Sequence, residues 1–189
     1  MKKKLLTLFF VLGISSTVSP QEIALKNNII YDATTTPNLA LEIGLKKKTT
    51  LDLYGGFNPF TFENNKKFKH WLFQPELRFW TCERFNGTFF GIHAHVGQFN
   101  FGGITLPFNM FPDVKTHRYE GNLYGGGVSI GHQWIFNKRL GLEASIGGGY
   151  AYGHYDKYLC PQCGERIGTY NKNYWGITRV TLSLIYVIR

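Results

Sequence analysis

The sequence predicts an all-β fold, an eight-stranded antiparallel up-and-down transmembrane β-barrel that follows a cleaved N-terminal signal. First, apolar and polar residues alternate with a period of two in eight stretches of the 189 residues, as expected for strands. Second, the polar positions hold so much Gly, Ser and charge that they could not fill a dry core, although they suit the interior of a membrane barrel. Third, no stretch reaches the roughly 20 apolar residues that a membrane-spanning helix requires.

The alternation is clearest in two stretches, Thr88–Phe101 and Leu140–Tyr155. In the first, Phe90, Ile92, Ala94 and Val96 alternate with Gly91, His93, His95 and Gly97. In the second, Leu142, Ala144, Ile146, Tyr150 and Tyr152 alternate with Gly141, Glu143, Ser145, Gly147 and Gly149. Successive side chains of a strand point to opposite faces, so we expect an apolar face toward lipid and a polar face inward.

The first 20 residues are predicted to be a secretory signal peptide. Lys2, Lys3 and Lys4 precede an apolar run, Leu5–Ile14, and small polar residues follow it. We place the start of the mature chain near Gln21, so that residues 21–189 form the outer-membrane β-barrel.

The alternation defines the strands in chain order. They are Ile23–Tyr31, Asn38–Leu45, Thr50–Asn58, Trp71–Cys82, Thr88–Asn100, Leu123–Phe136, Leu140–Tyr155 and Tyr174–Ile188. From the second strand on, each has an outward apolar row, which begins in turn at Leu39, Leu51, Trp71, Phe90, Tyr124, Leu142 and Val180. In the sixth strand Tyr124 and Trp134 are ten residues apart, a spacing that places one aromatic at each membrane interface. Pro75 lies on the outward row of the fourth strand and implies a bulge or a weak point there.

The connections predict which end of the barrel faces outward. Short turns at Lys46–Thr49, Glu83–Gly87 and Asn137–Arg139 are expected on the periplasmic side, together with both termini. The longer connections, Pro59–His70, Phe101–Asn122 and Asp156–Asn173, are expected outside. The segment Lys66–Lys69 is accordingly expected to be a loop that is solvated or faces lipid phosphates.

The inward positions collect charged residues of both signs. We predict that they pair in a lumen charge network, because eight strands leave an interior just wide enough for side chains and unpaired charges there would be costly. The network is predicted to contain Lys26, Glu42, Asp52, Glu76, Arg78, His93, His95, Glu143 and Arg179.

The motif Cys160-Pro-Gln-Cys163 lies in the last long connection. In an exported protein it is interpreted as a loop disulfide, or else as half of a metal site with His154 or Asp156 nearby. A redox role would require a thioredoxin-like context that the sequence lacks. Cys82 is expected at the opposite rim, too far away to pair with either.

No motif in the chain predicts catalysis. His93 and His95 could bind a metal or exchange protons, yet no nucleophile motif accompanies them, and we interpret them as hydrogen-bonded filling of the lumen beside Glu76 or Asp52. The glycine runs at 125–127 and 147–149 lack the Lys and the following helix of a phosphate loop, and we assign them to close strand packing. We therefore predict no catalytic residue, no metal and no cofactor.

Several sequence blocks are similar to one family. They are residues 24–28, 31–38, 51–59, 69–78, 121–131 and 155–160 with Cys163. On these blocks the chain resembles the domain of unknown function 3575 family of Gram-negative outer-membrane barrels, whose plan is similar to that of OmpA- and OmpX-type barrels. The resemblance implies a location in the bacterial outer membrane and, through gene neighbourhoods that encode fimbriae, a fimbrial or other envelope protein as partner. It lends no catalytic residues.

We therefore expect a non-enzymatic structural or surface-interaction protein in contact with outer-membrane lipid. The net charge of +9 does not predict nucleic-acid binding, because the charges lie at strand ends and in connections. One alternative is a small outer-membrane enzyme that acts on lipid or peptide at the outer rim, through residues such as His117, His154 or Asp156. Another is a lipocalin-like barrel with an interior ligand.

Overall fold

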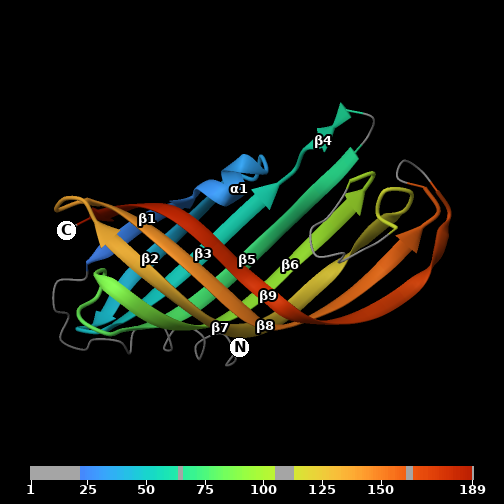
Figure 1. Cartoon of the computed structure of the whole chain (residues 1–189). Coiled ribbons are helices and arrows are strands. Elements are labelled where there is room, and N and C mark those ends of the chain that lie inside the picture. Colours follow the sequence, from blue (N-terminus) through green and yellow to red (C-terminus); the bar gives the residue numbers. More distant parts are fainter. Residues whose placement is uncertain (1–21, 64–65, 105–112, 161–163, 189) are drawn as a thin grey trace, which may run out of the picture.

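A computed structural model describes residues 22–63, 66–104, 113–160 and 164–188, and most of them belong to one antiparallel sheet (Figure 1). The predicted signal peptide and Cys163 lie outside the described residues. The elements in chain order are β1 (Ile23–Asn28), α1 (Ile29–Ala33), β2 (Asn38–Lys46), β3 (Thr49–Asn58), β4 (Thr61–Phe62), β5 (Lys66–Trp80), β6 (Gly87–Gly102), β7 (Arg118–Ile135), β8 (Leu140–Tyr158) and β9 (Arg166–Ile188).

Eight of the strands close into a ring. The order is β3-β2-β1-β9-β8-β7-β6-β5, and β3 pairs again with β5 to complete it. Strand β1 meets the last strand, β9, from Ile23 opposite Ile188 to Asn28 opposite Ser183. The short β4 pairs only with the beginning of β5. The prediction of eight main antiparallel strands is thus confirmed, and the inward side chains of all eight share one interior.

The ring has a closed part and an extended part. Strands β1, β2 and β3 have 6, 9 and 10 residues, whereas β5 to β9 have between 15 and 23. In Figure 1 the longer strands continue well past α1, so that end of the wall is uneven. The three short turns lie together at the opposite end. The alternation of short and long connections therefore separates two different ends of the molecule.

The predicted first strand was too long. Strand β1 ends at Asn28, whose side chain accepts a hydrogen bond from the amide of Ile30 and so caps α1. Residues Ile29–Tyr31 are consequently helical, although they had been assigned to the strand. In the described part of the chain, no helix has the length and apolar character needed to cross a membrane.

The predicted long connections were also wrong at their edges, because the hairpins extend further than the apolar rows. Lys66–Lys69 is not a loop but the start of β5, paired with β6 from Lys67 opposite Gly102. Strands β7 and β9 begin earlier than predicted, at Arg118 and Arg166, and β8 ends later, at Tyr158. Polar and aromatic residues occupy both faces of these extensions, so the sequence contains no apolar alternation to reveal them.

The proline in β5 does not produce a bulge. Pro75 pairs with Leu53 of β3, and the register between β5 and β6 is the same on both sides of it. Only the β5–β6 ladder is interrupted there, as expected for a residue without an amide donor. A bulge lies elsewhere, in β9: Gly147 and Gly148 of β8 pair with Arg179 and Ile177, so Thr178 is the extra residue. The bulge lets Arg179 point inward while Trp175, on its other side, is exposed.

The glycine runs of β7 and β8 face each other and permit close contact between the strands. Gly127 is opposite Gly149. A Cβ on Gly127 would collide with the carbonyl oxygen of Gly148, and one on Gly149 with that of Gly126. The prediction that these glycines serve close packing is confirmed.

Candidate functional site

Seven charged side chains from six strands meet inside the ring. All are at most 4% exposed. They are Lys26 on β1, Glu42 on β2, Asp52 on β3, Glu76 and Arg78 on β5, Glu143 on β8 and Arg179 on β9. We call this set the interior charge network.

The strand register explains why the network must contain cations. Glu42 is directly opposite Asp52, and Asp52 is opposite Glu76, so three carboxylates stand in one row across β2, β3 and β5. Like charges in adjacent positions of a sheet destabilise it. The row therefore requires positive side chains from other levels to lie between the carboxylates.

Arg78 is the central cation of the network. Its Nε donates to Glu76 (2.6 Å), and its Nη2 donates to Asp52 (3.2 Å). Its Nη1 donates to Glu42 (3.1 Å). Its two terminal nitrogens also form a bidentate pair with Glu143, at 2.8 and 3.0 Å. One guanidinium thus joins all four carboxylates, and its planar fork of donors is suited to that arrangement.

Two further cations complete the network. Lys26 pairs with Glu143 (2.6 Å) and with Glu42. Arg179 donates to Asp52 (2.8 Å) and to the amide oxygen of Gln74 (2.9 Å). With Arg78 these make three cations against four carboxylates. Such burial is tolerable only because each ion is paired, since an isolated buried charge is strongly unfavourable.

Neutral residues that sequence reasoning did not single out support the carboxylates. The hydroxyl of Ser129 donates to Glu76, and that of Thr50 donates to Glu42. Gly91 makes room for the first contact, because a Cβ there would meet both Ser129 and Glu76. Their inward parity was visible in the sequence, but only the register brings them to the level of the charges.

The two histidines are buried beside the interior charge network. His93 Nδ1 is 3.9 Å from Glu76, and its Nε2 shares a hydrogen bond with the hydroxyl of Thr178 (2.9 Å). The His95 ring lies 6.0 Å from the His93 ring, and its Nδ1 is buried without a hydrogen-bond partner among the described residues. In that part of the chain, no group of three or more His, Cys, Asp or Glu could hold a metal ion.

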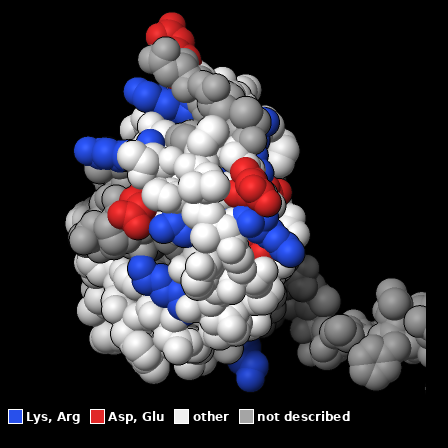
Figure 2. Space-filling view, turned by 90° about the vertical axis from the view of Figure 1, so that its right-hand side faces the viewer, with Lys and Arg blue, Asp and Glu red and all other residues white. Residues whose placement is uncertain are grey.

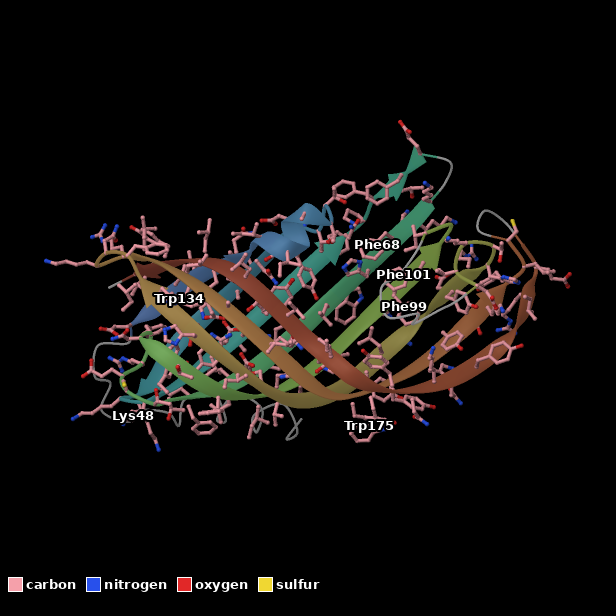
Figure 3. The ribbon with its side chains drawn as sticks, in the orientation of Figure 1. Lys48, Phe68, Phe99, Phe101, Trp134 and Trp175 are labelled. Carbon is pink, nitrogen blue, oxygen red and sulfur yellow. The ribbon has the colours of Figure 1, made fainter. Side chains whose placement is uncertain are left out.

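Apolar clusters lie inside the ring on both sides of the charges. Toward the short turns, Phe85 packs with Ala24 and Ile185. In the extended part, Phe99 packs with Tyr119 and Val114, which are all at most 4% exposed. Phe68, Phe99 and Phe101 lie close together on the extended strands (Figure 3). The polar interior is therefore bounded by packed side chains along the ring.

The two described cysteines, Cys82 and Cys160, are not part of the interior charge network. Cys82 is exposed and follows β5, next to a short turn. Cys160 is partly buried and follows β8, at the opposite end of the strands. The predicted disulfide or metal site depends on Cys163, which is outside the described residues.

The three residues named for an enzyme at the outer rim have separate partners. His154 shares a hydrogen bond with the side chain of Asn171 (2.6 Å), and His117 shares one with Thr116. The hydroxyl of Thr169 donates to Asp156 (2.5 Å), and this hydrogen bond lowers the pKa of the Asp156 carboxyl below its usual value. Among the described residues, no hydrogen bond joins two of these three candidates.

One protein family matches the chain. Its description is "Protein of unknown function (DUF3575)", and the match covers residues 6–188. No curated protein and no solved structure matches the chain.

Proposed function

The chain belongs to the DUF3575 family, and we propose that it is a non-enzymatic outer-membrane β-barrel with a closed interior and a structural or surface-interaction role. The observation that carries this proposal is the inverted distribution of polarity. The interior charge network is buried, whereas large apolar side chains are exposed around the wall; they include Leu39, Phe57, Phe73, Phe90, Ile92, Val128, Ile146 and Leu184.

Exposed apolar side chains in this number favour lipid over water as the surrounding medium. A soluble protein rarely exposes a contiguous apolar surface of more than a few hundred Å². Val128 is 64% exposed at the middle of β7, with Ile130 exposed beside it. A transmembrane strand is expected to have this pattern, with apolar side chains toward lipid and polar ones toward the interior.

The spacing of exposed aromatic residues along β7 matches the thickness of a typical membrane. Tyr124 and Trp134 of β7 are both exposed and ten residues apart. At about 3.3 Å per residue and a tilt of about 40°, that distance projects to about 25 Å, the height of a typical apolar band. Trp134 lies near the short turns in Figure 3, and Trp175, beside Tyr150, lies much further along the molecule.

The packed interior argues against transport and against a lipocalin-like binder. Charged side chains that pair with one another do not attract ions or solutes into the ring. A carrier of apolar ligands would need an apolar interior, whereas the interior around Arg78 is lined by charged side chains. We therefore place the biological role on the extended strands and their connections, which would face outward and contact a fimbrial or other envelope protein.

Planar-bilayer recording, epitope labelling and membrane fractionation test this proposal. Planar-bilayer recording should detect no stable, large conductance from the purified protein, and such a conductance would refute the closed interior. An epitope tag inserted after Lys115 should be labelled on intact cells, while one inserted after Lys138 should be labelled only after permeabilisation. Fractionation of the protein away from the outer membrane, or the reverse labelling pattern, would refute the location or the orientation.

A further inference from the structure

The end of the ring that carries the three short turns is strongly basic. Its described cations are Lys46, Lys47, Lys48, Arg84, Lys138 and Arg139, and its acidic residues are Glu22 and Glu83. We call this end the basic rim. Glu22 is paired with Arg84 (3.1 Å). The β2–β3 turn, with its three lysines, contains no acidic residue of its own.

The cations of the basic rim lie on two sectors of the ring. The β2–β3 turn supplies three lysines, and it contacts the β5–β6 turn through the amide of Arg84, which donates to the carbonyl of Lys47 (3.0 Å). The β7–β8 turn supplies Lys138 and Arg139 on another sector, where Arg139 accepts a hydrogen bond from the amide of Val187 on β9 (2.8 Å).

Each sector of the basic rim lies directly beyond exposed apolar or aromatic side chains. Leu45 precedes the lysines, Phe136 precedes Lys138, and both are exposed. The Arg139 guanidinium donates to the hydroxyl of Tyr186 (3.3 Å), an exposed residue of β9. In Figure 3 Lys48 and Trp134 lie at the same end of the molecule. The cations thus stand where a lipid headgroup would follow the apolar band.

The other end of the ring has a different charge pattern. Figure 2 looks onto it and shows Lys and Arg mixed with Asp and Glu. Several of these charges pair locally, such as Lys157 with Asp113 (3.1 Å) and Arg166 with Asp156 (3.4 Å). A surface that neutralises its own charges attracts an anionic layer less than the basic rim does.

We propose that the basic rim binds the headgroups of anionic phospholipids in the membrane leaflet on the short-turn side. This inference rests on the proposed membrane location and adds the class of lipid and the side on which it is selected. An annular layer of headgroups meets both sectors at once, and each sector presents cations at headgroup depth. Basic residues near a membrane surface attract anionic lipids in this way.

The test uses the full chain reconstituted in bilayers of phosphatidylcholine and phosphatidylglycerol, with spin-labelled lipids of each class as probes. The protein should enrich phosphatidylglycerol over phosphatidylcholine in its lipid shell by about threefold at low salt, with a smaller ratio at high salt. Combined replacement of Lys46, Lys47, Lys48, Lys138 and Arg139 by Gln should reduce the ratio to about one.

A matched variant separates the rim from net charge alone. It removes five cations at the other end, through replacement of Lys66, Lys67, Lys69, Lys115 and Lys172 by Gln. This variant should retain most of the enrichment. An equal loss in both variants, or an unchanged ratio in the rim variant, would overturn the inference. All three proteins should still insert into pure phosphatidylcholine, and failure of the unmodified protein to do so would refute the membrane proposal instead.

Discussion

Replacement of Arg78 by Ala should be among the most damaging single changes in the chain. Its guanidinium is completely buried and pairs with four carboxylates. Without it, Lys26 and Arg179 would remain as the only cations of the interior charge network. Breaking one buried ion pair costs about 3–5 kcal/mol, so we expect the free energy of unfolding to fall by at least about 4 kcal/mol.

Urea titration of the folded protein in detergent micelles, followed by tryptophan fluorescence, would measure this loss. Arg78→Lys keeps the charge but loses the bidentate pair with Glu143, and it should cost about half as much. The double variant Arg78→Met/Glu143→Gln removes a cation and a carboxylate together, and it should recover part of the loss. If Arg78→Ala unfolds at the urea midpoint of the unmodified protein, the carboxylates are satisfied by water, and the argument for a closed interior fails.

Three further predictions concern other parts of the ring. Gly91→Ala should destabilise the protein by about 1–3 kcal/mol in the same urea titration, because a methyl group would collide with the Glu76 contact; Gly148→Ala is the control and should be nearly neutral, because a Cβ there would make only an ordinary van der Waals contact with the carbonyl oxygen of Gly176, at 3.5 Å. Ile146→Arg should cost about 2–4 kcal/mol in lipid vesicles, the range for a charge that faces the middle of a bilayer, and full tolerance would contradict the outward assignment. Thr169→Val should raise the pKa of Asp156 when carboxyl resonances are titrated by NMR, because it removes the hydrogen bond that lowers this pKa. In the unmodified protein the stabilisation from that bond is present above the ordinary aspartate pKa and disappears as the pH falls through the lowered value, so an Asp156 pKa that does not respond to Thr169→Val would refute the assignment.

The strand ends beyond the apolar rows could not be predicted from the sequence. A period-two pattern is visible only where the two faces of a strand meet different surroundings. Beyond the apolar rows, both faces carry polar and aromatic side chains, as at Lys66–Lys69 and Arg166–Asn173. The hydrogen bonds between strands continue there, although no apolar row marks them in the sequence. The predicted connections were therefore too long.

The start of α1 shows a different limit. Ile29 and Ile30 fit a strand as well as a helix, and the choice depends on the side chain of Asn28. That side chain caps the helix and also accepts from the amide of Leu182 on β9. A contact with a residue more than 150 positions away cannot be deduced from local pattern.

By itself the sequence determined the number of main strands, their antiparallel order and which residues face inward, because each follows from alternation and the lengths of connections. It also placed charges of both signs in one interior. Only the tertiary structure decided which charges meet. Glu42, Asp52 and Glu76 share a row because of the register between their strands, and Arg78 reaches all four carboxylates because the ring is closed and narrow. Register and closure arise from pairing between distant segments, and a one-dimensional pattern specifies the face of a side chain but not its neighbours across the ring.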